Sequence, residues 1–339
     1  MSAVRVLFVI PGAARGNSMI FARRQAASLR DAGVEVSLFH LRSRTSLVRM
    51  AREWVRFRRR VRRIHPHIIH AHFGTVTAMF AALAAPMLPL VVTFYGGDLN
   101  PASRQAAGSE RTRAFLGRVL SQLAALRAAR TICVSGQLRE RLWWRRRNTL
   151  VLPTGVDQRV FAPEPQARAR ERLGWTASER VVLFNAGRDA RIKRLDLARA
   201  AVELARPLVA GLRLEVLDGG TAPERIPTFM NAADCLLLTS DSEGSPTVIQ
   251  EALACNLPVV SVDAGDVVER LRGVGRAQIV ARDPAAIASA LAAMLAAPGR
   301  SDGRRKLAEF SASHIAGELR RVYGELTGPG MASVAGAAG

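Results

Sequence analysis

Short apolar runs alternate with longer segments of helical character along almost the whole chain, and this alternation limits the fold more than any other feature. Strands are expected at residues 4–10, 34–40, 68–71, 90–94, 131–134, 150–152, 181–185, 213–217, 235–239, 259–262 and 278–280. Helices are expected between or after them, at 18–31, 46–63, 75–85, 110–127, 136–145, 195–206, 247–254, 284–296 and 304–326. Such alternation is typical of parallel sheets with right-handed crossovers, so the sequence predicts an α/β fold with two Rossmann-like domains.

The length of 339 residues suits two domains of ordinary size. The first domain is expected at 1–155 and the second at 156–327, with the Pro- and charge-rich stretch 153–179 as their connection. The last helix either stays with the second domain or packs back on the first. The Gly- and Ala-rich end, 328–339, is expected to be a disordered tail. Widely spaced cysteines in apolar surroundings, without a signal peptide, indicate a cytosolic protein with reduced thiols.

Positive charge is concentrated in the first half of the chain. Residues 1–150 hold 26 arginines and 6 acidic residues, a net charge of +20, whereas 151–339 hold 23 basic and 22 acidic residues, a net charge of +1. A bias in base composition would act on both halves alike, so the first half is expected to face an anionic partner. Its segment 47–64 is a basic amphipathic helix with aromatic residues. The apolar side of this helix either lies on an anionic membrane or packs against the sheet, and in both cases the arginines can hold the domain to the membrane.

Common phosphate and metal motifs are absent from the sequence. There is no Gly-x-Gly-x-x-Gly after a strand, no Gly-x4-Gly-Lys-Ser/Thr and no Asp-x-Asp. Dinucleotide binding, P-loop hydrolysis and a nucleotide held through a metal at Asp-x-Asp are therefore not supported. The histidines between 65 and 72 lack cysteine or carboxylate partners, so no metal and no cofactor is expected. His72 is expected to line a cleft or to pack inside the domain.

Residues 241–251, Asp-Ser-Glu-Gly-Ser-Pro-Thr-Val-Ile-Gln-Glu, carry the strongest functional signal. They follow an apolar strand, and Pro246 favours the first turn of a helix with Ser245 as its N-cap. Ligands of open α/β sheets bind at the carboxyl ends of the strands, where Glu243 and Glu251 lie on either side of the helix start.

The start of this helix is also a candidate phosphate site. Its backbone N–H groups, with those of the preceding loop, are free of helical partners and point along the helix dipole. The residues expected to form this cradle are Gly244, Ser245, Thr247 and Val248.

The same segment is where the chain resembles a known family. Glu243-x7-Glu251, followed by Asn-Leu-Pro-Val-Val at 256–260, is similar to the retaining glycosyltransferases of family 4, and above all to their teichuronic-acid-biosynthesis branch. The resemblance continues through three further segments, at 226–234, 152–157 and 70–74. It covers roughly residues 4–323 and implies the GT-B fold, in which two Rossmann-like domains face each other across a cleft. It also implies a metal-independent hexosyltransferase that uses a nucleotide-sugar donor.

The resemblance assigns roles to the charged residues of the second domain. Arg188 and Lys193 follow the strand at 181–185, where cations stabilise the negative charge of a departing diphosphate. Matching positions of the family bind the donor diphosphate and replace a metal. Glu243 is implied to contact the donor sugar, and Glu251 is implied to bind the ribose hydroxyls.

Two loops of the first domain are further candidates. In the family, the loop that here contains Gly12 and Gly16 contacts the donor phosphates or the acceptor, although family members often have two adjacent glycines there. Tyr95 stands where the family commonly has a histidine that touches the sugar, and tyrosine is a poor base at neutral pH. Asp98 is equally well interpreted as an acceptor contact or as the cap of a turn.

These observations predict a cytoplasmic glycosyltransferase associated peripherally with the inner face of the membrane. Its acceptor would be a cell-surface or exopolysaccharide glycan on a lipid diphosphate. One alternative is a nucleotide-sugar epimerase of similar architecture. The other is a protein that binds nucleic acid or another polyanion, suggested by a pI near 11.6. Nucleic acid is not an expected partner, because no recognised motif is present and the phosphate-site residues lie in the neutral half.

Overall fold

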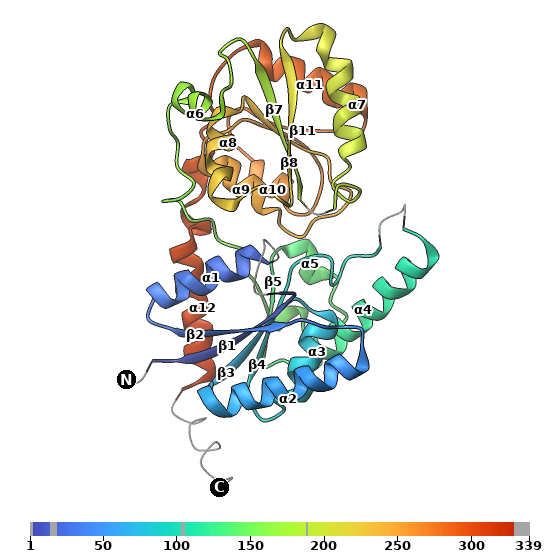
Figure 1. The fold of residues 1–339 in the computed structure, drawn as a ribbon, viewed down its shortest axis with the longest axis vertical. Helices are drawn as coiled ribbons and strands as arrows, with labels where there is room; N and C mark the ends of the chain where they lie inside the picture. Colours follow the sequence, from blue (N-terminus) through green and yellow to red (C-terminus); the bar gives the residue numbers. More distant parts are fainter. Residues whose placement is uncertain (1–2, 14–18, 103–105, 188, 329–339) are drawn as a thin grey trace. The chain divides into compact units, whose positions relative to one another are not determined.

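A computed structural model describes residues 3–13, 19–102, 106–187 and 189–328 (Figure 1). The chain divides into two compact units, and it passes between them twice. Met1–Thr154 and Ala312–Gly339 make up the first unit, and Gly155–Ser311 make up the second. The last helix therefore belongs to the first unit, and most of the expected tail lies outside the described residues.

The described part of the first unit is built on a six-stranded parallel sheet of order β2-β1-β3-β4-β5-β6. Its strands are β1 (Arg5–Pro11), β2 (Glu35–Leu41), β3 (Ile68–His72), β4 (Leu90–Phe94), β5 (Arg130–Cys133) and β6 (Thr149–Val151). Successive side chains of β1 enter two different cores, because Leu7 and Val9 join one apolar cluster and Val6 and Phe8 join the other. Burial on both faces explains why these strands read as continuous apolar runs.

Helices cover both faces of this sheet. They are α1 (Ile20–Asp31), α2 (Leu47–Ile64), α3 (Thr75–Ala84), α4 (Gly108–Arg127), α5 (Gly136–Glu140) and α12 (Ala312–Leu326). α1 and α12 share one core, and α2, α3 and α4 contribute to the other (Figure 1). The expected helix at 136–145 ends early, at Glu140, because Trp143 N and Trp144 Nε1 donate to Gln122 instead.

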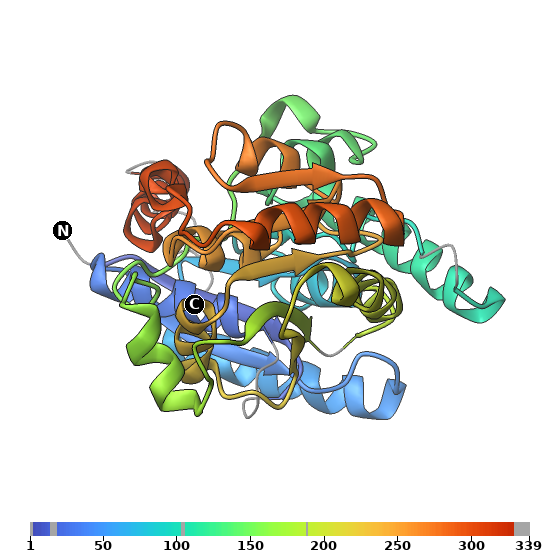
Figure 2. The same ribbon diagram turned by 90° about the horizontal axis from the view of Figure 1, so that it is seen from above.

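The described part of the second unit has a five-stranded parallel sheet of order β11-β10-β9-β7-β8. Its strands are β7 (Arg180–Gly187), β8 (Leu212–Asp218), β9 (Cys235–Leu238), β10 (Val259–Val262) and β11 (Ala277–Val280). Its helices are α6 (Gln166–Leu173), α7 (Leu195–Ala205), α8 (Ile226–Ala232), α9 (Thr247–Ala254), α10 (Val267–Leu271) and α11 (Pro284–Ala296). α7 and α11 pack against each other, and α6, α8, α9 and α10 form a second set of contacting helices (Figure 2).

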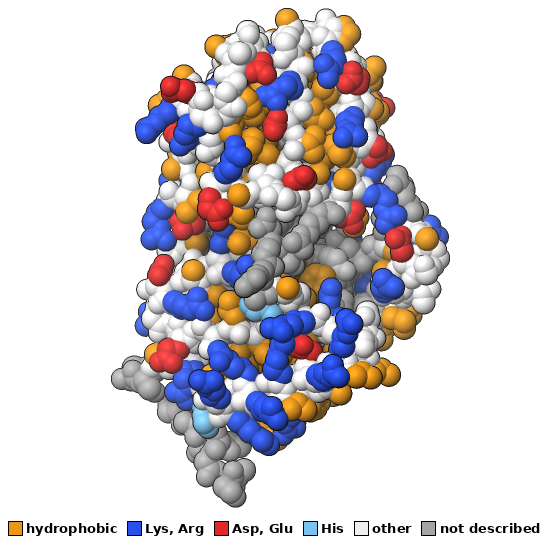
Figure 3. Space-filling view, viewed as in Figure 1, with side chains coloured by type: hydrophobic (Ala, Val, Ile, Leu, Met, Phe, Trp, Pro, Cys, Tyr) orange, Lys and Arg blue, Asp and Glu red, His pale blue; other side chains and the backbone are white. Residues whose placement is uncertain are grey.

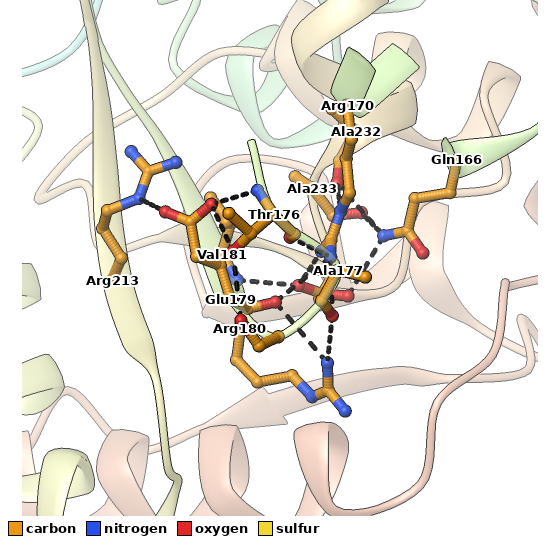
Figure 4. A network of polar contacts seen from close by, with 12 residues as sticks. Gln166, Arg170, Thr176, Ala177, Glu179, Arg180, Val181, Arg213, Ala232 and Ala233 are labelled. Atoms are coloured by element: carbon orange, nitrogen blue, oxygen red, sulfur yellow. Dashed lines mark hydrogen bonds and ion pairs between the residues drawn. The ribbon is translucent and has the colours of Figure 1, made fainter. Parts of the chain in front are cut away.

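The stretch at 153–179 is not a simple connection, since α6 within it is part of the second unit. Arg170 of α6 is buried, and its guanidinium donates to the backbone oxygens of Ala232 at 3.0 Å and Thr176 at 3.1 Å and to Asp234 Oδ2 at 2.7 Å (Figure 4). Val181 N donates to the same carboxylate oxygen at 2.7 Å. One charged residue thus joins α6 to α8 and to the start of β7. The charge-rich composition of this stretch predicted a connection, whereas the structure has a helix of the second unit there.

The expected helix at 304–326 is also interrupted. Two short 3-10 turns, Gly303–Lys306 and Ala308–Phe310, precede α12. The chain leaves the second unit between them and α12, and a change of unit breaks the helical path. Among the described residues, no helix is both long enough and apolar enough to span a membrane.

Candidate active site

A lysine and a glutamate meet at the carboxyl edge of the second sheet. Lys193, in the turn that precedes α7, places Nζ 2.5 Å from Glu243 Oε1, in the loop between β9 and α9. Their side chains are only 27% and 13% exposed, so this pair is partly withdrawn from water. Two residues predicted from separate segments as catalytic are therefore in direct contact.

The two loops are also tied to each other through their backbones. Thr239 Oγ1 donates to the Lys193 oxygen at 2.9 Å, and Asp241 N donates to the Ile192 oxygen at 2.9 Å. Arg194 Nη1 lies 3.2 Å from Asp241 Oδ1. Hydrogen bonds to Asp196 and Asp241 raise the pKa of Arg194. Arg194, which the sequence analysis did not single out, thus fixes the loop that carries Lys193.

The N-cap of α9 differs by one residue from the prediction, although the helix spans the expected residues 247–254. Pro246, not Ser245, is the N-cap, and it makes no side-chain capping hydrogen bond. Pro246 has extended backbone angles, so the helix begins only at Thr247. The first turn contains no acidic residue, which leaves the positive end of the helix dipole without a neighbouring carboxylate on α9. Gly244 and Ser245 precede this turn, as a phosphate cradle requires.

A glycine from the next loop closes against this cradle. Gly265 has φ +62°, and a Cβ atom there would lie 2.8 Å from the Gly244 oxygen and 3.0 Å from Glu243 Cβ. Any larger residue would push the β9–α9 loop away. The position of Glu243 is thus set by the close approach of two backbone segments.

Glu251 lies one helical turn beyond Thr247 and is 9% exposed. Side chains four residues apart share a helix face, and helical side chains lean toward the N-terminus. Glu251 therefore lies on the same face of α9 as Thr247, the residue that begins the helix. Of the remaining predicted donor residues, Arg188 and Gly16 lie outside the described residues. Gly12 has φ +104°, and its N–H donates to the Leu41 oxygen at 3.0 Å.

In the first unit, Asp98 organises the loops at the carboxyl edge of β3 and β4. Its buried carboxylate accepts N–H groups from Gly74 and Gly96, both at 2.9 Å, and from Tyr95 at 3.1 Å. Burial raises the pKa of Asp98, and these hydrogen bonds oppose the rise. This geometry is that of a turn cap and favours that interpretation over an acceptor contact.

His72 and Tyr95 belong to a buried polar ladder under these loops. His72 Nδ1 lies 2.7 Å from the Tyr95 hydroxyl, and the His72 ring stacks on His70 at 4.2 Å between centroids. His70 bonds in turn to Thr93 Oγ1 at 2.7 Å and to the Tyr323 hydroxyl of α12 at 2.6 Å. Burial lowers the pKa of His70 to about 3 and that of His72 well below its usual value, and it raises the pKa of Tyr95. All these groups are neutral at pH 7, so Tyr95 is no base there.

The loop after β3 carries backbone strain that sequence reasoning missed. Phe73 has φ +97° and Thr75 has φ +52°, a region that side chains other than glycine seldom adopt. A Cβ atom on Gly74 would clash with Ser121 Oγ, whose oxygen accepts the Thr75 N–H at 2.7 Å. Strain of this kind is concentrated at binding sites. Within the described part of the chain, no three His, Cys, Asp or Glu side chains gather as metal ligands.

Two family models match the chain, one largely in each unit. Residues 13–160 match glycosyltransferase family 4, and residues 177–297 match the glycosyl transferases of group 1. The chain belongs to the family 4 glycosyltransferases. This confirms the resemblance inferred from Glu243-x7-Glu251 and the segments around it.

Curated relatives match this chain over part of their length. The teichuronic acid biosynthesis glycosyltransferase TuaC of Bacillus subtilis, a name given to it as putative, is 29% identical over 61% of this chain and 55% of its own. A D-inositol 3-phosphate glycosyltransferase of Thermobispora bispora is 31% identical over 53% of this chain and 50% of its own. The chain thus spans about half the length of the curated relatives it matches.

Solved structures show the fold. Sucrose-phosphate synthase from Thermosynechococcus elongatus gives a TM-score of 0.77 at 17% identity, over 95% of this chain and 99% of that one. Anabaena Alr3699/HepE in complex with UDP and glucose gives 0.71 at 17% identity, over 94% and 99%. UDP-GlcNAc 2-epimerase from Methanocaldococcus jannaschii gives 0.59 at 11% identity, over 94% and 99%. The predicted GT-B class, with two Rossmann-like α/β domains, is confirmed.

Proposed function

We propose that this glycosyltransferase moves a sugar from a nucleotide-sugar donor to a glycan acceptor, with retention of the anomeric configuration and without a metal. The observation that carries the proposal is the contact between Lys193 and Glu243 beside the start of α9. It provides a cation for a diphosphate, a carboxylate for sugar hydroxyls and a helix start for phosphate oxygens in one place.

The donor would occupy the second unit. Glu251 accepts hydrogen bonds from the ribose hydroxyls, and the N–H groups at the start of α9 receive the diphosphate. Lys193, together with Arg188, meets the negative charge that develops as the bond from the sugar carbon to the phosphate oxygen breaks. Glu243 holds the Lys193 ammonium in place and contacts the sugar.

The acceptor hydroxyl needs a group that takes its proton. Of the two described candidates at the loop edge of the first unit, neither is a ready base, because burial lowers the pKa of His72 and makes it a weak proton acceptor, and Tyr95 holds its proton tightly. We therefore assign this role to the departing phosphate oxygen. The acceptor oxygen bonds to the sugar carbon on the face that the phosphate leaves, and the acceptor proton passes to that phosphate, so both bonds and the proton are accounted for.

A panel of nucleotide sugars tests this assignment. UDP-sugars come first, because a structural neighbour binds UDP and glucose and a curated relative is named for teichuronic acid biosynthesis. Release of nucleoside diphosphate that continues in EDTA, with an α-linked product from an α-linked donor, is the expected result. Complete inactivation by EDTA that a divalent ion reverses would reject the metal-free mechanism. Conversion of free donor to its epimer without acceptor would support the alternative of an epimerase.

The acceptor is proposed to be a cell-surface or exopolysaccharide glycan on a lipid diphosphate, at the inner face of the membrane. The arginines of the first unit support this location through charge. Replacing five α2 arginines by Gln should reduce sedimentation with phosphatidylglycerol vesicles and leave nucleotide affinity unchanged. These five are Arg58, Arg59, Arg60, Arg62 and Arg63.

Five exposed arginines of the second unit provide the matched control for that experiment. They are Arg168, Arg172, Arg199, Arg206 and Arg225. Both sets remove the same formal charge, so an equal loss of vesicle binding in the two variants would show that net charge, and not the α2 surface, is responsible. Equal sedimentation of the native protein with phosphatidylcholine and phosphatidylglycerol would reject the anionic membrane as a partner.

A further inference from the structure

Exposed large apolar side chains gather on three helices of the first unit. We define the apolar face by Val48 and Val55 of α2, Leu83 of α3, and Phe115, Leu116 and Leu123 of α4. These side chains are 43–66% exposed. α3 packs against both other helices, so the three helices form one continuous surface. Single exposed apolar residues are ordinary, whereas a group on adjacent helices indicates an interaction surface.

An open groove of about 500 Å³ lies within this face. Trp54 and Val55 of α2, Met79 and Leu83 of α3, and Leu120 of α4 are among the residues that line it, and every lining residue is apolar. The volume falls in the range of ligand pockets, which is roughly 300–1,000 Å³. The groove therefore offers space for a hydrocarbon group, and among its lining side chains only the indole N–H of Trp54 is an ordinary hydrogen-bond donor.

Positive charge borders the apolar face at the helix ends. The outward stripe of α2 holds Val48, the exposed Arg52 and Val55 in its first half, and it continues one turn later with arginines alone, the exposed Arg58, Arg59 and Arg62. Figure 3 shows this division along α2, with hydrophobic side chains at one end and Arg side chains gathered at the other.

The helix α4 repeats this arrangement. Arg111 and Arg113 lie before its exposed Phe115 and Leu116, and Arg127 ends the helix. Both helices thus place apolar side chains between or beside cations.

We infer that the apolar face docks on an anionic membrane and that its groove receives one hydrocarbon chain of a lipid, with the bordering arginines on lipid phosphates. An amphiphile with an anionic head matches both parts of the surface. A soluble polyanion would pair with the arginines but leave the groove uncovered. A second copy of the chain would bring two surfaces of the same positive sign together. This inference rests on the membrane part of the proposed function.

The first test removes the apolar contacts while leaving every arginine in place. Val55, Leu83 and Leu116 are changed together to Asp, and the matched control changes Val160, Leu204 and Leu208 of the second unit to Asp. The two sets have similar exposure, 49–58% and 48–65%. On vesicles of phosphatidylglycerol, the first variant should bind at least about tenfold more weakly than the native protein. The control variant, which carries the same change in net charge, should bind like the native protein. An equal loss in both variants, or none in the first, would overturn the inference.

The second test measures whether a lipid acyl chain enters the groove. Trp54 fluorescence should be quenched when the vesicles contain lipids brominated on their acyl chains, and Trp54→Phe should lose that part of the quenching. Binding to vesicles without this quenching would mean docking through charge alone and would reject the chain site. A stable dimer in sedimentation that shields Trp54 without lipid would assign the groove to a second copy instead.

Both tests use the full chain without donor or acceptor, so they do not depend on sugar transfer. Calorimetry with UDP on the same variants reports the donor site separately. Intact nucleotide binding in a variant that no longer binds vesicles would locate the defect at the apolar face. Vesicle binding by a protein that binds no nucleotide would leave the membrane inference standing and count against the proposed donor site.

Discussion

Buried and half-buried arginines tie the interior of the second unit together, whereas a ladder of neutral side chains runs through the interior of the first. In the second unit, Arg170, Arg300 and Arg304 lie inside or partly inside and donate to backbone oxygens, such as Arg300 Nη1 to Ala233 at 2.8 Å and Arg304 Nη1 to Phe161 at 2.8 Å. In the first unit, the buried ladder consists of histidine, tyrosine and threonine side chains. Its buried carboxylates, Asp98 and Glu53, are held by backbone N–H groups or by Arg56.

The two units thus use the same abundant residue differently. Arginines of the second unit are matched by acidic residues and by carbonyl oxygens, and its net charge is close to zero. Those at the end of α2 are exposed on a unit of strong positive charge. Net charge counts every arginine alike, so it does not distinguish the exposed arginines of α2 from those that donate to backbone oxygens inside the second unit.

The largest expected effect tests the internal arginines. Arg170→Ala removes the guanidinium that pairs with Asp234 and donates to the oxygens of Ala232 and Thr176, so the free energy of unfolding of the second unit should fall by about 3–5 kcal/mol. Urea unfolding followed by hydrogen exchange, which resolves the units, measures it. The control, Arg59→Ala on the exposed side of α2, should stay within about 0.5 kcal/mol. Similar losses of unfolding free energy in the two variants would show that the internal arginine of the second unit stabilises the fold no more than an exposed arginine of the first.

The next effect concerns the chain's only two lysines. Lys193→Ala should lower kcat by about 10²–10³, or roughly 3–4 kcal/mol, because a cation that faces charge formed in the transition state is lost. Lys306→Ala, at an exposed position of the same unit, should leave kcat unchanged. Steady-state kinetics of the two variants measures kcat and KM. A rise in KM alone for Lys193→Ala would mean that this lysine binds the substrate and the transition state equally.

Acid should destabilise the first unit selectively. The pKa of His70 is about 3 in the folded protein, and that of His72 is also lowered, whereas both are near 6.5 when unfolded. Below pH 6.5 the unfolded state binds protons that the folded state cannot, so stability falls as the pH falls. Each histidine contributes about 1.4 kcal/mol per pH unit in this window. Hydrogen exchange between pH 7 and 5 should show the loss in the first unit.

Two variants check that assignment of the acid sensitivity. His72→Gln should reduce the slope of stability against pH, and His314→Gln, at an exposed position of α12, serves as the control for loss of a histidine. If only the second unit lost stability as the pH fell, the assignment of neutral, buried His70 and His72 in the first unit would be contradicted.

The smallest effect tests a carboxylate of the second unit. Glu251→Ala should weaken UDP binding by about 1–3 kcal/mol, because the ribose hydroxyls lose a charged acceptor. The control is Glu203→Ala on the exposed side of α7, whose carboxylate pairs with Arg206. Isothermal titration calorimetry measures both. Equal affinities in the two variants would remove Glu251 from the donor site.

Apolar pattern was sufficient to predict much of the fold. The bounds of β4, β10, α9 and α11 agree with the sequence analysis, because a buried strand or helix leaves an apolar run with Pro or polar residues at its ends. α6 was missed because its buried face depends on Arg170, whose carbonyl partners lie in other elements. A pattern of apolar residues does not reveal a helix held by a charged side chain.

The candidate site was predicted residue by residue but not as a set of contacts. Lys193 and Glu243 were both identified, yet their pairing depends on two loops joined through Thr239 and Asp241. The bond between His70 and Tyr323 spans 253 positions, and no spacing rule connects residues so far apart. The cap at Pro246 was misplaced by one residue, because the choice between Ser245 and Pro246 is made by backbone angles.

The return of α12 to the first unit has a consequence for the order in which the protein is made. All residues of the second unit have been synthesised once the ribosome has passed Ser311, and Val156 pairs with Ser311 to close that unit. The first unit, although translated earlier, still lacks Tyr323, which is fully buried in its core and bonds to His70. Its core stays open until the last helix emerges. Translation that stops before α12 would release a finished second unit attached to a basic unit with one face of its sheet covered by α1 but not by α12, and such exposed apolar surface is a substrate for chaperones and proteases.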